Sequence, residues 1–148
     1  MGSDEDIKWI LEKFRTVAVV GLSRNSSKDS YRVAKYLRNN GYKIIPINPF
    51  ADEIMGETCY GRLLDIPKDL QKTIEIVDIF RPSEDIPPIV DEAIRLRKDN
   101  GTPHVIWMQL EIINEEAANR ARDFGFKVIM DKCILVEHKV LLRKKQIE

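Results

Sequence analysis

One stretch near the start of the chain constrains the fold more than any other. Residues 16–30 read Thr-Val-Ala-Val-Val-Gly-Leu-Ser-Arg-Asn-Ser-Ser-Lys-Asp-Ser. The apolar run at 17–20 does not alternate with polar residues, which predicts a strand buried on both faces of a parallel sheet. The run ends at Gly21, a polar loop follows, and a helix is expected to begin near Ser30, with Ser30 as its N-cap. A strand that passes through a glycine to a helix N-terminus is typical of a phosphate site in α/β proteins.

The rest of the chain continues this alternation of strands and helices. Apolar runs predict further strands at 43–48, 74–80, 104–108 and 127–130, and helical spacing of apolar residues predicts helices between them. Short loops between such elements indicate an α/β fold, a Rossmann-like doubly wound parallel sheet in one three-layer domain. Pro46 predicts that its strand lies at an edge, contains a bulge or is close to its end. Glu75 and Asp78 predict that one face of the 74–80 strand is less buried.

The balance of charge excludes several classes of partner. The chain has 148 residues, with 24 basic and 24 acidic side chains, so no overall field attracts nucleic acid or an anionic membrane. No apolar run approaches the roughly 20 residues of a membrane span. Cys59 and Cys133 lie far apart and form no metal-binding spacing, which indicates reduced thiols in a cytoplasmic protein and no metal site. The charged fraction of 32% resembles that of thermophile proteins.

The loop after the first strand has chemistry suited to phosphate. Ser23 and Ser30 offer hydroxyls, Arg24 and Lys28 offer positive charge, and the helix N-terminus offers free N–H groups. A solvated serine-rich turn is the alternative interpretation. Ordinary NAD binding is disfavoured, because only one glycine of the G-x-G-x-x-G fingerprint is present and the second strand ends in Asn48 rather than an acid.

Several segments, taken together, resemble one family. They are 17–23 (V-A-V-V-G-L-S), 30–34 (S-Y-R-V-A), 41–49 (G-Y-K-I-I-P-I-N-P), 78–83 (D-I-F-R-P-S), 105–110 (V-I-W-M-Q-L), 114–118 (N-E-E-A-A) and 130–134 (M-D-K-C-I). They follow in order the pattern of the small CoA-binding domain family, which is similar to the N-terminal CoA-binding domain of the succinyl-CoA synthetase alpha subunit. The resemblance implies one CoA-binding domain over 1–148, with a core at about 15–134 and a tail at 135–148 that fits either a helix or a strand.

The same resemblance implies a site for coenzyme A or acyl-CoA along the ends of the strands. It implies that the first loop contacts the phosphates and that the residues after the second strand contact the adenosine part. The residues after the third strand would form a wall against adenine or the pantetheine arm, and those after the fourth strand would line the far end of the site. The implied site residues are Gly21, Leu22, Ser23, Arg24, Lys28, Ser30, Tyr31, Asn48, Pro49, Phe80, Arg81, Pro82, Trp107, Met108 and Gln109.

No arrangement of residues predicts catalysis, so no catalytic residue is assigned. His104 opens a predicted strand, and His138 lies in the tail; neither has a partner at a catalytic or metal-binding spacing. The synthetase has a second domain with a phosphorylated histidine, and the chain is expected to lack that domain. We therefore expect a non-covalent binding module. The alternatives are a subunit of an acyl-CoA ligase-type enzyme whose partner supplies catalysis, or an NAD-type nucleotide-binding sensor. A protein partner or a homo-oligomer is compatible with each of these functions.

Overall fold

The computed structural model describes residues 3–147, which form a parallel sheet between two layers of helices. The sheet has the strand order β2-β1-β5-β6-β7, and every neighbouring pair in it is parallel. A separate hairpin consists of β3 and β4. The elements are α1 (Asp4–Lys13), β1 (Thr16–Val20), α2 (Asp29–Asn39), β2 (Lys43–Ile47), β3 (Glu53–Ile54), β4 (Glu57–Thr58), η1 (Leu63–Asp65), α3 (Lys68–Gln71), β5 (Ile76–Ile79), η2 (Ser83–Asp85), α4 (Ile86–Asn100), β6 (Val105–Met108), α5 (Glu115–Asp123), β7 (Lys127–Ile129) and α6 (Ile134–Ile147).

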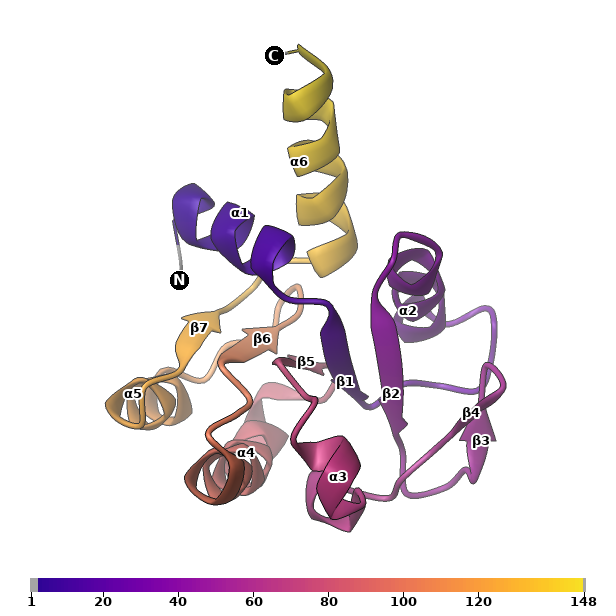
Figure 1. Cartoon of the computed structure of the whole chain (residues 1–148), viewed down its shortest axis with the longest axis vertical. Helices are drawn as coiled ribbons and strands as arrows, with labels where there is room; N and C mark the ends of the chain where they lie inside the picture. The colour runs from indigo at the N-terminus through magenta and orange to yellow at the C-terminus, as the bar shows by residue number, and fades with distance from the viewer. Residues whose placement is uncertain (1–2, 148) are drawn as a thin grey trace.

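Each strand sends alternate side chains into two separate cores. In β1, Val17 and Val19 belong to the core beneath α1, α2 and α6, whereas Ala18 and Val20 belong to the core shared with α4 and α5. Figure 1 shows these two helical layers, with α1, α2 and α6 on one side of the sheet and α3, α4 and α5 on the other. The unbroken apolar runs in the sequence follow from this burial on both faces, and the predicted doubly wound α/β fold is confirmed.

Pro46 lies in the edge strand β2, as one of its predicted settings required. Its carbonyl accepts a hydrogen bond from the Tyr60 backbone on the outer side of the sheet. The proline nitrogen therefore faces the same outer side, and the missing N–H removes no bond to β1.

Two local predictions were wrong. Helix α2 begins at Asp29 with Lys28 as its N-cap, and Ser30 lies inside the first turn instead of capping it. Asp78 is fully buried rather than on an exposed face, and all four residues of β5 are buried. The core can accept Asp78 because burial raises the pKa of its carboxyl well above the usual range, which keeps it neutral.

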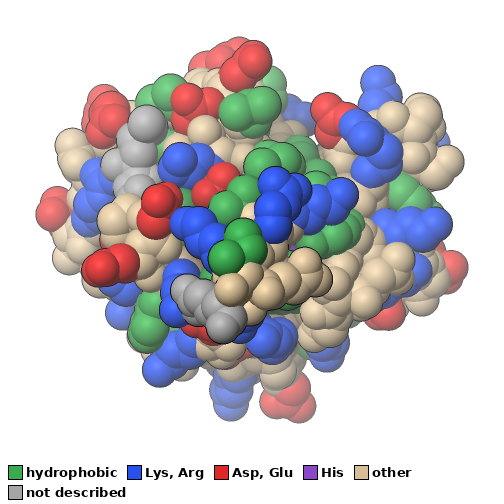
Figure 2. Space-filling model, turned by 90° about the horizontal axis from the view of Figure 1, so that it is seen from above, with side chains coloured by type: hydrophobic (Ala, Val, Ile, Leu, Met, Phe, Trp, Pro, Cys, Tyr) green, Lys and Arg blue, Asp and Glu red, His purple; other side chains and the backbone are tan. Residues whose placement is uncertain are grey.

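The segment after β7 is a helix, α6, which begins in the core and ends in solvent. Ile134, His138 and Leu141 are buried, and the last turns project beyond the other elements (Figure 1). Lys145 forms an ion pair with Glu12 of α1 at 2.6 Å. Seen from this end, acidic and basic side chains are interspersed (Figure 2). None of the helices within residues 3–147 has the length and apolar character needed to span a bilayer.

Candidate functional site

Gly21 forms the turn at the carboxyl end of β1, where the strand order changes direction. Counted along the chain, the sheet has the order 2-1-3-4-5, in which ligands bind near the end of the first strand. Gly21 has φ +86°, a left-handed conformation that favours glycine. A Cβ atom at this position would lie 2.5 Å from the backbone oxygen of Phe80. The glycine therefore allows the loop after β1 to pack against the loop after β5.

The loop after β1 is held in shape by its own serine and asparagine side chains. The Ser23 backbone N–H donates to Ser30 Oγ at 2.9 Å, which links the start of the loop to α2. Ser23 Oγ accepts from the Asn25 N–H at 3.0 Å, and Asn25 Oδ1 accepts from the Ser27 N–H at 2.9 Å. Lys28, the N-cap of α2, makes no side-chain capping bond, so the first amides of the helix remain available to an anion.

Asn48 joins the loop after β2 to the loop after β1. Its Nδ2 donates to the Leu22 carbonyl at 3.0 Å, and its Oδ1 accepts from the Phe50 N–H at 2.8 Å. A carboxylate could make only the second of these bonds. These two hydrogen bonds require an amide, rather than the acid expected for NAD, directly after β2.

Two hollows meet at Arg81 along the carboxyl ends of the strands. The β1–β2 hollow has a volume of about 420 Å³ and is lined by residues that include Gly21, Ser23, Asn48, Pro49, Phe50, Arg62, Arg81 and Glu92. The α2–α6 hollow has a volume of about 540 Å³ and is lined by residues that include Arg32, Val33, Phe80, Arg81, Pro82, Gln109, Leu110, Cys133, Leu135 and Val136. Because Arg81 lines both, the two hollows adjoin at this side chain.

The positive charges around these hollows differ in how freely they can bind an anion. Arg81 forms an ion pair with Asp85 at 2.8 Å, and Arg32 pairs with Asp29. Among residues 3–147, neither Arg24 nor Lys28 takes part in an ion pair, and both are exposed. These two side chains can therefore contact a phosphate without first breaking an ion pair.

The predicted site residues fall into three groups. Eight of them line the hollows, namely Gly21, Ser23, Asn48, Pro49, Phe80, Arg81, Pro82 and Gln109. Arg24, Lys28, Ser30 and Tyr31 lie on the loop or on the first turn of α2. The structure does not bring the side chains of Leu22, Trp107 and Met108 to either hollow, because they are fully buried in the two cores.

The buried groups at the far end serve the fold. Trp107 Nε1 donates to the Lys132 carbonyl at 2.8 Å, and Gln109 Oε1 accepts from the Ile134 N–H at 3.1 Å, which fixes the start of α6. His138 Nδ1 lies 2.7 Å from the Tyr36 hydroxyl, and burial lowers the pKa of this histidine. The side chains of Trp107, Gln109 and His138 therefore have structural roles.

Sequence reasoning missed several residues that line the hollows. Phe50 is 84% exposed and directly follows Asn48 and Pro49, so the strand-end rule could have included it. Arg62 and Glu92 come from segments that follow no predicted strand, and no sequence signal indicated them. Cys133 lies in the M-D-K-C-I segment but was not among the implied site residues; it is half-buried and lines the α2–α6 hollow.

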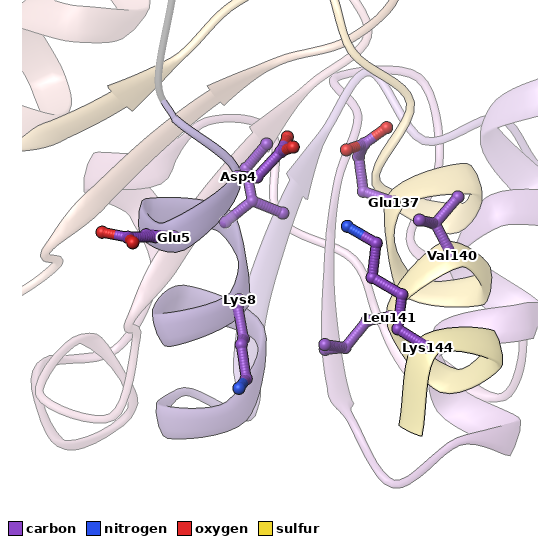
Figure 3. Close-up of a pocket in the computed structure, with 8 residues that line it drawn as sticks. Asp4, Glu5, Lys8, Glu137, Val140, Leu141 and Lys144 are labelled. Atoms are coloured by element: carbon purple, nitrogen blue, oxygen red, sulfur yellow. The ribbon is translucent and has the colours of Figure 1, made fainter. Parts of the chain in front are cut away.

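Other surface features do not add to this site. A smaller hollow of about 190 Å³ lies between α1 and α6 (Figure 3). Its lining includes Asp4, Glu5, Lys8, Glu137 and Lys144, so charges of both signs compete there. Within residues 3–147 no group of three or more His, Cys, Asp or Glu side chains could hold a metal ion.

Proteins of known sequence give independent information. Uncharacterized protein YneT of Bacillus subtilis is 38% identical over 138 residues, which cover 93% of this chain and 96% of that protein. An ADP-forming acetate–CoA ligase of Methanocaldococcus jannaschii is 28% identical over 137 residues, which cover 90% of this chain. The chain spans only 19% of the length of that ligase.

Solved structures include close matches to the fold. A hypothetical protein from Pyrococcus horikoshii superposes with a TM-score of 0.85 and 35% identity, covering 95% of this chain and 93% of that one. The dinucleotide-forming acetyl-coenzyme A synthetase 1 of Ca. Korarchaeum cryptofilum matches with a TM-score of 0.66 and 26% identity, covering 82% of this chain and 27% of that one. The sequence pattern of the CoA binding domain family matches residues 15–139. The chain therefore belongs to the CoA binding domain family, as its sequence motifs predicted.

Proposed function

We propose that this chain binds coenzyme A non-covalently along the carboxyl ends of β1, β2, β5 and β6. The observation that carries the proposal is the pair of hollows that meet at Arg81, beside a loop that carries unpaired positive charge. CoA is an elongated ligand with a phosphorylated nucleotide at one end and a thiol at the other. The β1–β2 hollow has the more polar walls and the α2–α6 hollow the more apolar walls, which supports this division of the ligand. Membership of the CoA binding domain family supports the same ligand.

The nucleotide end is assigned to the β1–β2 hollow. Arg24 and Lys28 lie on the loop after β1, which also contributes Gly21 and Ser23 to the wall of this hollow. Their charges and the free amides of α2 would bind the phosphates. The pantetheine arm would then pass Arg81 into the α2–α6 hollow, which has the more apolar walls.

Charge-removing variants test this assignment. Arg24→Ala and Lys28→Ala should each weaken CoA binding by about fivefold or more in a calorimetric titration, because each removes a charge-assisted contact of about 1–3 kcal/mol. Lys35→Ala is the matched control, since Lys35 is an exposed lysine on α2, away from both hollows. Equal effects of Lys28→Ala and Lys35→Ala would place the phosphates elsewhere. If Arg24 reaches the ribose 3′-phosphate, Arg24→Ala should weaken CoA more than dephospho-CoA.

The second candidate function is that of a component of an acyl-CoA ligase-type enzyme whose partner supplies catalysis. The alignment with part of the acetate–CoA ligase of M. jannaschii favours it. Purification from the native organism distinguishes the two functions. A stoichiometric partner that confers ligase activity on the mixture would establish the ligase component, whereas CoA binding by the chain alone would support an independent binding module.

A further inference from the structure

We propose that the α2–α6 hollow accommodates a neutral aliphatic acyl group longer than acetyl on the thiol of CoA. This inference rests on the proposed CoA binding and adds the class of acyl group. It starts from the position of the hollow, which adjoins the β1–β2 hollow at Arg81 and extends from the first turns of α2 to the start of α6.

The walls of this hollow are largely apolar and come from several elements. Val33 of α2, Phe80 after β5, and Leu135 and Val136 of α6 face it, together with Leu110 after β6. Leu110 is 60% exposed and Val136 is 49% exposed, although both side chains are hydrophobic. A bound aliphatic chain would cover these surfaces and remove them from water.

The polar groups of the hollow have partners already. Arg32 is paired with Asp29, Arg81 is paired with Asp85, and Gln109 Oε1 accepts the Ile134 N–H. Both ion pairs lie at the surface, so a terminal carboxylate would find no unpaired cation among the hollow-lining residues that the structure describes, whereas the apolar walls stabilise a neutral aliphatic end. The hollow therefore favours a neutral acyl chain over a dicarboxylic one such as succinyl.

The size of the hollow allows more than an acetyl group. Its volume of about 540 Å³ is larger than the 420 Å³ of the β1–β2 hollow, and an acyl chain longer than acetyl would continue along its apolar walls. Full burial of one methylene raises affinity about fourfold, and partial burial in this open hollow should give about twofold. Hexanoyl-CoA, with four more methylenes than acetyl-CoA, should therefore bind at least about tenfold more tightly.

Calorimetric titration of the whole chain with CoA, acetyl-CoA, butyryl-CoA, hexanoyl-CoA and succinyl-CoA tests the inference. We expect affinity to rise from acetyl to hexanoyl and succinyl-CoA to bind more weakly than butyryl-CoA. Leu110→Ser should lower the preference for hexanoyl-CoA over CoA by about threefold or more. Leu142→Ser is the matched control, because Leu142 is a 40% exposed leucine outside the hollow, and its replacement should leave that preference unchanged.

The possible failures can be told apart. If CoA binds but hexanoyl-CoA binds no more tightly, the hollow receives only the pantetheine end and the acyl inference is refuted alone. Tighter binding of succinyl-CoA than of butyryl-CoA, or equal effects of the two leucine variants, would also refute it. If none of the five ligands binds, both the proposed function and this inference fall.

Discussion

Replacement of Asn48 by aspartate removes one hydrogen bond and leaves the shape of the side chain almost unchanged. In the native protein Nδ2 donates to the Leu22 carbonyl at 3.0 Å, and Oδ1 accepts from the Phe50 N–H at 2.8 Å. In Asn48→Asp the bond to Phe50 can persist, but a carboxylate oxygen would face the Leu22 carbonyl oxygen. Two acceptors then oppose each other at the point where the β1 and β2 loops meet.

The expected cost follows from this geometry. The loss of one partly buried hydrogen bond that leaves an acceptor unsatisfied costs about 1–3 kcal/mol in the free energy of unfolding. For a domain of this size each kcal/mol lowers the melting temperature by about 2–4 °C, so we expect a decrease of about 2–12 °C at pH 7. A protonated carboxyl can donate to Leu22, and the decrease should therefore become smaller near pH 4.

Urea unfolding at pH 7 and pH 4 measures this effect, with Asn25→Asp as the control. The side chain of Asn25 accepts hydrogen bonds through Oδ1 from both the N–H and the hydroxyl of Ser27, and an aspartate can accept the same two bonds. Asn25→Asp should change stability by less than about 0.5 kcal/mol, as is usual for an exposed position. Equal stability of the two variants, or a larger loss for Asn48→Asp at pH 4 than at pH 7, would refute the role given to Asn48.

Three further predictions concern the sheet, the glycines and the thiols. Burial raises the pKa of Asp78 in the folded state, so unfolding releases its proton. As the pH rises from the unfolded to the folded pKa value, the free energy of unfolding of the wild type should therefore fall by up to about 1.4 kcal/mol per pH unit. Asp78→Asn should lack this component in urea unfolding across pH, and parallel curves for the two proteins would contradict it. Gly21→Ala should destabilise the protein by more than about 2 kcal/mol, because the added Cβ would lie 2.5 Å from the Phe80 backbone oxygen. Gly41→Ala, with open space around the added Cβ, should cost only about 1 kcal/mol of left-handed strain. Similar melting temperatures of the two variants would argue against close packing of Gly21 on Phe80. Burial raises the pKa of Cys59, so Cys133 should react first with a thiol reagent at pH 8. Acetyl-CoA, whose sulfur is blocked and does not consume the reagent, should slow the reaction of Cys133. Faster labelling of Cys59, or labelling of Cys133 that acetyl-CoA does not slow, would oppose these assignments.

The prediction for Gly21 also changes how that residue can be used as a probe. A larger side chain at Gly21 could in principle block a phosphate, and a loss of CoA binding would then locate the site. In the structure the added atoms would first meet the Phe80 backbone. A loss of binding in Gly21→Val would therefore report a damaged loop, and the charge-removing variants of Arg24 and Lys28 are the sharper probes.

Regular features of the sequence predicted the architecture because they depend on local chemistry. The unbroken run of β1 required burial on both faces. Asn114, a residue type favoured at helix N-caps, caps α5, where its side chain accepts from the Ala117 N–H at 3.0 Å. Pro46 indicated an edge strand through its missing donor. Each of these residues has the same role whatever surrounds it.

The failures arose where distant contacts decide a residue's role. Ser30 is a good N-cap by type, but its hydroxyl accepts the Ser23 N–H seven residues earlier, which fixes it inside the helix. Asp78 carries a charge in water, and only the layers packed on β5 make its neutral form the favoured one. Arg81 lines one hollow with the end of β1 and the other with the start of α6. These segments are distant in the sequence, so no local pattern predicts the boundary between the two hollows.

Titration of the purified wild-type chain with CoA, with NAD as the comparison ligand, tests the central claim most directly. We expect saturable binding of one CoA per chain and much weaker or undetectable binding of NAD, because the Asn48 amide is hydrogen-bonded to the Leu22 carbonyl and only one fingerprint glycine is present. Binding of NAD without binding of CoA would contradict the proposed CoA site.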